Sequence, residues 1–250
     1  MDNAKIGLLT TLLLGVFILI GSLMAFLINK KNKVIDFSIG LAFGVIVMLI
    51  ITDLVPEIIE HLGLTKIYLF IIFSCVGFFL LRVLDNFIPD HDEEHLQGKA
   101  LKDNLIHIGI ITSLALVLHN IIEGMAVYSS LISNTNLGLA LTLGIGFHNI
   151  PFGIVIASSF HQSNQNIWKT IVIIILLSLS TFVGGLIMFF LNITTINPII
   201  LGILLSITLG MLVYIVYEEL FPRIKDNKKK KINYIGIAVG VLILIISMIV

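Results

Sequence analysis

Residues 119–124 read His-Asn-Ile-Ile-Glu-Gly, and residues 148–153 read His-Asn-Ile-Pro-Phe-Gly. Four of the six positions are the same in both stretches: His, Asn, Ile and Gly. Each stretch lies in the middle of a long apolar run, where ionisable side chains are costly and tend to mark function. His119 and Glu123 are four residues apart, so they share one helix face, with Asn120 beside them. The two stretches predict a polar site inside a membrane-spanning bundle.

The composition of the chain requires a membrane. Of its 250 residues 58% are hydrophobic and only 12% are charged, against a typical charged share of about 25%. The mean hydropathy is +1.10. So few charges cannot cover a water-facing surface, which excludes a soluble protein. Basic and acidic residues balance at 15 each, which argues against nucleic acid as a partner. The single Cys75 excludes a disulfide framework and a thiolate metal cluster.

Eight apolar runs are long enough to cross a lipid bilayer, because roughly 20 apolar residues span the hydrocarbon core. We predict an all-α polytopic membrane protein whose spans are residues 6–28, 35–61, 66–88, 104–131, 137–160, 170–191, 197–221 and 232–250. Twelve of the fifteen Lys and Arg residues follow spans 1, 3, 5 and 7, whereas the opposite side carries only Lys5 and Lys66. Basic loops face the cytoplasm, so both termini are expected outside.

The longest predicted connection is a cytoplasmic loop over residues 89–103. It contains His91 and His95 on either side of Asp-Glu-Glu. Carboxylates and imidazoles packed this closely could hold a divalent ion loosely. A solvated polar loop is the alternative interpretation.

The two repeated motifs indicate a metal site. They lie on neighbouring spans that run in opposite directions, so they form a short inverted repeat that meets at the membrane centre, as in many transporter sites. Two imidazoles and a carboxylate, from His119, His148 and Glu123, suit Zn²⁺, with water or an amide oxygen completing the shell. The alternative is a buried His–Glu pair that only packs the bundle.

A second pair of motifs lies further from the centre. Acidic-Leu-x-Pro occurs at Asp53–Pro56 near the end of span 2 and at Glu219–Pro222 near the end of span 7. Asp53, Glu57 and His61 follow one helical stripe and would line an outer vestibule. Glu218 and Glu219 would lie on the way to the cytoplasm. Ordinary polarity at helix ends is the alternative interpretation.

These residues resemble the ZIP family of zinc/iron-regulated transporters, and most of all its bacterial GufA-type branch. The resemblance rests on the eight spans, the acidic-His loop, His-Asn-x-x-Glu-Gly at 119–124, His-Asn-x-Pro at 148–151 and Glu-Leu-Phe-Pro at 219–222. It implies a single ZIP-like domain over residues 1–250, with spans arranged 3+2+3 as inverted repeats around spans 4 and 5. It also implies uptake of Zn²⁺, and sometimes Fe²⁺, Mn²⁺ or Cd²⁺, by an elevator-like movement, and a homodimer.

Two positions depart from the family pattern. Phe152 stands where the family commonly has a Glu that helps to bridge two metals, and Thr181–Gly184 lacks a carboxylate that the family often has in span 6. Strong ligands then remain at His119, Glu123 and His148, and weak ones at Asn120 and Asn149. We therefore predict a mononuclear site.

Three functions follow from this sequence. The first is divalent-metal uptake across a bacterial plasma membrane, in which His91 and His95 would sense accumulated metal. The second is a metal sensor that has lost transport, suggested by Phe152 and Thr181. The third is an intramembrane metallohydrolase, which the sequence disfavours because it lacks His-Glu-x-x-His. We therefore expect a protein that is not an enzyme and has no catalytic cofactor.

Overall fold

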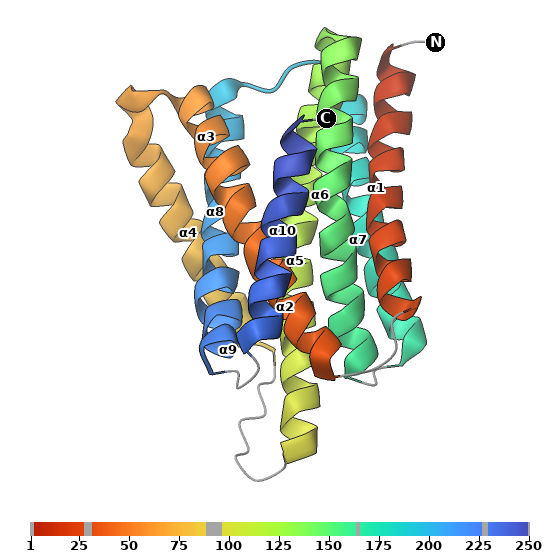
Figure 1. Cartoon of the computed structure of the whole chain (residues 1–250). Helices are drawn as coiled ribbons and strands as arrows, with labels where there is room; N and C mark the ends of the chain where they lie inside the picture. Colours follow the sequence, from red (N-terminus) through yellow and green to blue (C-terminus); the bar gives the residue numbers. More distant parts are fainter. Residues whose placement is uncertain (1–2, 28–31, 89–96, 164–165, 227–229, 250) are drawn as a thin grey trace.

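The structure is a computed structural model that describes residues 3–27, 32–88, 97–163, 166–226 and 230–249. Every regular element within those residues is helical (Figure 1). The α-helices are α1 (Asn3–Leu27), α2 (Asn32–Leu49), α3 (Val55–Leu62), α4 (Ile67–Asp85), α5 (Gln97–Ser133), α6 (Thr135–Gln162), α7 (Ile167–Phe190), α8 (Pro198–Tyr214), α9 (Phe221–Asp226) and α10 (Lys230–Ile249). The short turns are η1 (Ile50–Leu54) and η3 (Ile215–Leu220), both π-helical, and the 3-10 turn η2 (Leu64–Lys66).

Within the described ranges, eight helical segments are long and apolar enough to cross a membrane. This confirms the all-α polytopic prediction, and the segments lie within a few residues of the predicted spans. One boundary was predicted wrongly. Helix α5 already begins at Gln97, so the last seven residues of the predicted loop 89–103 are helical. Ala100, Leu101 and Lys102 are good helix formers, which accounts for this earlier start.

Spans 2 and 7 are interrupted by the π-helical turns η1 and η3. The N–H of Val55 bonds to the carbonyl of Ile50, and the N–H of Phe221 bonds to that of Val216, each five residues back. A proline follows each of these donors, at 56 and 222, and lacks the N–H that would continue the regular ladder. Wide turns of this kind are frequent at functional sites.

Four helices, α1, α5, α6 and α7, pack so closely that their backbones touch, and we call them the site-bearing group. A Cβ atom added to Gly15 of α1 would lie 2.0 Å from the carbonyl oxygen of Ser178 on α7. The same test at Gly124 of α5 gives 1.9 Å to the carbonyl oxygen of Thr181. Small residues are what allow membrane helices to approach this closely.

The remaining helices, α2, α3, α4, α8, α9 and α10, with the turns η1, η2 and η3 that connect them, form what we call the flanking group. A Cβ atom at Gly77 of α4 would lie 1.9 Å from the carbonyl oxygen of Ile207 on α8. At Gly40 of α2 the distance to the carbonyl oxygen of Asn233 on α10 would be 2.2 Å. The flanking group lies to the left in Figure 1, and α1, α6 and α7 lie to the right.

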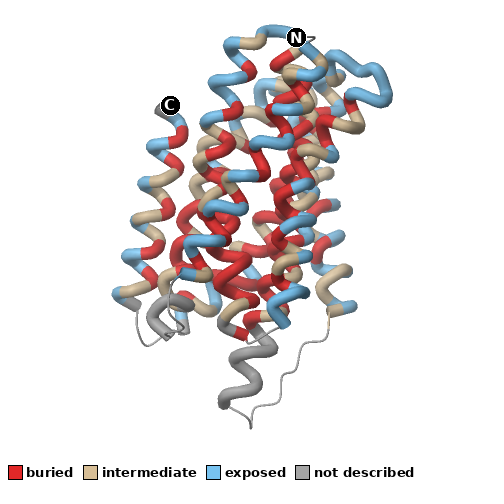
Figure 2. The backbone as a smooth tube through the Cα atoms, turned by 90° about the vertical axis from the view of Figure 1, so that its right-hand side faces the viewer, coloured by how far each residue is buried: buried red, intermediate tan, exposed pale blue. Residues whose placement is uncertain are grey.

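The seam between the two groups is packed less closely. Among the described glycines, only Gly144 of α6 approaches a backbone atom of the other group, and its added Cβ would lie 3.1 Å from the carbonyl oxygen of Ser247 on α10. Buried residues concentrate inside the bundle and exposed ones lie toward its outside (Figure 2). Of the eight spans α5 is the most buried and α4 the least. The two groups therefore meet mainly through side-chain contacts.

The start of α1 and the end of α10 lie at the same end of the molecule (Figure 1). An even number of crossings requires this. We call this end the terminal end. The opposite end holds the starts of α2, α5 and α10. In the sequence, most Lys and Arg residues lie close to these three helix starts. We call this opposite end the basic end.

Candidate metal centre

Three side chains from α5 and α6 converge at the middle of the bundle. One carboxylate oxygen of Glu123, Oε1, lies 2.9 Å from Nε2 of His119 and 2.9 Å from Nε2 of His148. The three residues can each offer a ligand atom within 4.8 Å of the others. His119 lies midway along the span Leu105–Ser133, and His148 midway along Thr135–His161. The predicted pairing of the two motifs is therefore what the structure contains.

The donor set fits a tetrahedral zinc ion after a small adjustment. Zinc binds imidazole nitrogen at 2.0–2.1 Å, which requires neighbouring ligand atoms to be about 3.3 Å apart. The Nε2–Oε1 separations need to open by only a few tenths of an ångström. The second oxygen of Glu123, Oε2, is buried and has no hydrogen-bond partner among the described residues. A buried carboxylate oxygen without a partner is costly, and a cation would satisfy it.

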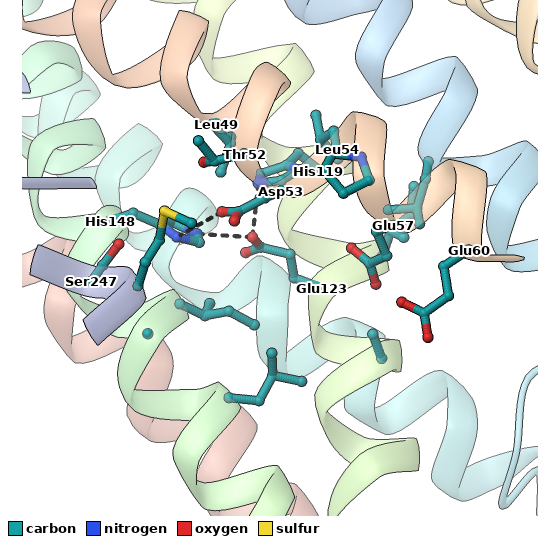
Figure 3. Close-up of a pocket in the computed structure, with 18 of the residues that line it drawn as sticks. Leu49, Thr52, Asp53, Leu54, Glu57, Glu60, His119, Glu123, His148 and Ser247 are labelled. Carbon is teal, nitrogen blue, oxygen red and sulfur yellow. Dashed lines mark hydrogen bonds and ion pairs between the residues drawn. The ribbon is translucent and has the colours of Figure 1, made fainter. Parts of the chain in front are cut away.

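A cavity of about 520 Å³ leads from these side chains toward the terminal end. It lies in the seam, because α5 and α6 line one side and η1, α3, α8 and α10 line the other. Glu60, Ala140 and Met248 lie near the ends of their helices and mark its outer part. Figure 3 shows His119, Glu123 and His148 at its inner end, with Asp53 reaching in from the opposite wall.

Two of the three predicted outer vestibule residues, Asp53 and Glu57, line this cavity. Asp53 places Oδ2 3.9 Å from Nδ1 of His148 across the seam. Glu57 and Glu60 also line the cavity, on α3 (Figure 3). His61 is partly exposed and lies 3.8 Å from Glu57, measured from Nε2 to Oε1. The carboxylates thus form a negatively charged approach to the metal centre.

The two asparagines predicted as weak ligands do not line the cavity. Both are fully buried, and Nδ2 of Asn120 lies 3.5 Å from the carbonyl oxygen of Leu177 on α7. This contact ties α5 to α7. The amide of Asn149 has no hydrogen-bond partner among the described residues. The ligand role of Asn120 and Asn149 stays a prediction.

The two departures from the family pattern have clear positions. The ring of Phe152 is buried and lies edge-on to His119 and His148, with ring centroids 6.3 Å and 6.1 Å away. It follows His148 by one turn toward the basic end, so it forms an apolar floor below the metal centre. The hydroxyl of Thr181 donates to the carbonyl of Thr11 and serves helix packing.

A second group of ionisable residues lies at the basic end. Nε2 of His107 is 2.7 Å from Oδ1 of Asp85 and 3.3 Å from Oε1 of Glu219. The other oxygens of the two carboxylates are held by Tyr214, whose hydroxyl donates to Asp85 over 2.5 Å, and by Arg223, 3.3 Å from Glu219. These three donor residues could also hold a metal ion by their type and spacing.

Only Glu219 of this group was predicted from the sequence. Asp85, at the end of span 3, and His107, at the start of span 4, were not predicted as site residues. The signal that could have found them was available, because the topology places the end of span 3, the start of span 4 and the end of span 7 on one side. Glu218 is exposed beside this group, and His91 and His95 lie outside the described residues.

Comparison with known proteins identifies the family of this chain. The family described as ZIP Zinc transporter matches residues 89–248, more than half of the chain. Proteins named Zinc transporter ZupT are similar over nearly the full length. The protein of Chlorobium chlorochromatii is 27% identical, and the alignment covers 99% of this chain and 98% of the relative. The protein of Clostridium perfringens is 28% identical, and the alignment covers 99% of this chain and 96% of the relative. That of Escherichia coli is 24% identical, covering 98% and 96%. This chain belongs to the ZIP zinc transporter family.

Proposed function

We propose that this protein carries Zn²⁺ across a membrane into the cytoplasm, one ion at a time, through a site made of His119, Glu123 and His148. The observation that carries this proposal is the single carboxylate oxygen of Glu123 placed 2.9 Å from both imidazoles at mid-span. The names of its relatives, zinc transporters, support the metal. Fe²⁺, Mn²⁺ and Cd²⁺ accept the same nitrogen and oxygen donors and are proposed as further substrates.

Uptake is the proposed direction because the cavity and the basic loops lie at opposite ends. Lys and Arg are enriched in cytoplasmic loops, so the terminal end would face outside and the cavity would receive ions from there. Both chain termini would then be outside. We place the protein in a bacterial plasma membrane, where Asp53, Glu57, Glu60 and His61 would concentrate cations at the entrance.

Movement of the site-bearing group against the flanking group would complete transport. The close glycine contacts join α1, α5, α6 and α7 to one another, and the seam beside them is looser, which supports a site-bearing group that moves as a unit. In the flanking group such contacts join α2 to α10 and α4 to α8. The paired acidic-Leu-x-Pro turns support a 3+2+3 arrangement with inverted repeats over a single domain, residues 1–250. A homodimer in the lipid bilayer is proposed from the family resemblance.

A metal sensor without transport is the second candidate function. The ring of Phe152 closes the floor of the metal centre on the side away from the cavity. If that floor never opens, zinc binds and stays. The enzyme alternative gains no support, since ZIP proteins are transporters.

Uptake into proteoliposomes that hold the purified protein tests the proposal, with Zn²⁺ and Cd²⁺ offered outside. We expect saturable uptake that His119→Ala abolishes and His161→Ala leaves intact, since His161 packs on Phe26 away from the metal centre. Stoichiometric binding without any flux would favour the sensor. Undiminished flux in His119→Ala would refute the proposed site.

A further inference from the structure

The contact at the basic end joins the two helix groups. His107 belongs to α5 of the site-bearing group, whereas Asp85 ends α4 and Glu219 lies in η3, both in the flanking group. The side chain of His107 is buried and its Nε2 lies between the two carboxylates, at 2.7 Å and 3.3 Å. Hydrogen bonds between charged groups are among the strongest that side chains make.

Other side chains of the flanking group fix the positions of both carboxylates that His107 contacts. Tyr214 and Arg223 each bind one oxygen, Oδ2 of Asp85 and Oε2 of Glu219. The remaining oxygens, Oδ1 and Oε1, are those that His107 contacts. The acceptor positions are therefore fixed by one group, and the donor is supplied by the other.

Just inside this contact the seam is closed and mostly apolar, but it contains two hydroxyls that have no partner among the described residues. A void of about 10 Å³ separates α2 from α5 and α6, a volume that barely admits one water molecule. Ser38 of α2 and Ser158 of α6 line it, and both hydroxyls are buried without a hydrogen-bond partner among the described residues. Unpaired buried hydroxyls are rare in a surface made only for packing. Their presence indicates a seam that meets water in another state.

We propose that His107, Asp85 and Glu219 form a latch that holds the basic end closed while the cavity at the terminal end is open. The proposal rests on the transport function proposed above. When the site-bearing group moves, His107 leaves the two carboxylates and the seam at Ser38 and Ser158 opens. Asp85 and Glu219 are then free to accept the cation that the group delivers. His107 acts through this movement and is a positioning residue, not a ligand of the central site.

Thiol labelling of two reporter cysteines tests the latch without requiring transport. In a Cys75→Ala background, Ser158→Cys reports on the seam at the basic end, and Ala126→Cys reports on the cavity. The protein is held in nanodiscs in zinc-free buffer with a chelator, and a small charged methanethiosulfonate reagent is added. Both ends are accessible in nanodiscs, so the two labelling rates compare directly.

The expected result is a reciprocal change. His107→Ala should raise the labelling rate at Ser158→Cys by about tenfold, the population change that follows the loss of one hydrogen bond to a charged group. The labelling rate at Ala126→Cys should fall. Asp85→Asn with Glu219→Gln should act in the same way. The control is His161→Ala, which deletes another histidine at the basic end of the site-bearing group. It should change neither rate.

Two outcomes overturn the latch. If His107→Ala raises labelling at both reporters, the residue only stabilises the fold. If neither rate changes, the contact does not control the seam. A reciprocal change in a protein that moves no zinc would support the latch and count against the proposed function, so the two failures can be told apart.

Discussion

Asp53 and Glu219 hold the same place in two π-helical turns, each three residues before a proline. Each faces a histidine of the site-bearing group. Asp53 lies 3.9 Å from His148 near the central site, and Glu219 lies 3.3 Å from His107 at the basic end. Each π-helical turn thus presents an acidic residue to one half of the seam, at opposite ends of the route that we propose for the ion.

Removing the charge of Glu123 tests the shared oxygen at the central site. Glu123→Gln keeps the size of the side chain but loses the anion that two imidazoles contact. We expect zinc affinity to fall by at least about tenfold, equivalent to about 1.4 kcal/mol, with transport lost in parallel. Isothermal titration and proteoliposome uptake measure the two effects. Unchanged affinity would place the metal elsewhere.

Phe152 sets the predicted number of metal ions. The native chain should bind one Zn²⁺ at the central site, because an apolar ring stands where a second carboxylate would be needed. Phe152→Glu should raise the zinc stoichiometry measured by equilibrium dialysis by one, and Phe152→Leu should not. A large gain in flux with Phe152→Glu would mean that the native protein is specialised for binding at the expense of transport. Two ions bound to the native site would contradict the mononuclear prediction.

The vestibule carboxylates should affect capture more than translocation. Glu57→Gln with Glu60→Gln removes two negative charges from the cavity wall but leaves the three central ligands in place. We expect the KM for zinc to rise several-fold, on the order of the tenfold that electrostatic steering supplies, with the maximal rate nearly unchanged. The difference should shrink at high ionic strength. A loss of maximal rate alone would argue against a steering role.

Zinc uptake should weaken in acid when both sides of the membrane have the same pH. Coordination needs neutral imidazoles and an ionised carboxylate, so protons compete with the metal at His119, His148 and Glu123. The apparent affinity should therefore fall as the pH drops. Uptake measured between about pH 5.5 and 8, with the same buffer on both sides of the membrane, tests this. Affinity that rises in acid would exclude the imidazoles as ligands.

Glycine contacts inside the site-bearing group should be sensitive to a single methyl group. Gly15→Ala would bring a Cβ to 2.0 Å from the backbone oxygen of Ser178, so α1 must move away from α7. Overpacking of this kind costs about 1–3 kcal/mol. We expect a lower midpoint of thermal unfolding in detergent. The control is Gly144→Ala at the seam, where 3.1 Å leaves a small adjustment. Equal effects of both changes would contradict the division into two groups.

Much of the fold could be predicted because hydropathy and charge are strong signals in a membrane. Eight spans followed from apolar run length alone. The interruption of two spans could not be predicted in detail, since the sequence of a π-helical turn does not distinguish it from a regular helical turn. Pro56 and Pro222 marked the places, but only geometry distinguishes a kink from a wide turn.

The central site was predictable for a different reason. His119, Glu123 and His148 stand alone in apolar surroundings, so their types and spacing are informative. The contact between His107 and Asp85 was not predicted, because 22 residues and a connection separate them, and polar residues near span ends are common. The two helix groups were also missed, since glycine positions do not reveal which helix each one meets.

Glu123 belongs to the site-bearing group and Asp53 to the flanking group, and this division bears on the response to membrane voltage. A zinc ion held by neutral imidazoles and Glu123 alone gives the moving site a net charge of +1. The empty site returns with a charge of −1. A negative interior attracts the loaded site inward and repels the empty site outward, so the electric field drives both half-cycles. Each contributes at most about 2.3 kcal/mol per 100 mV.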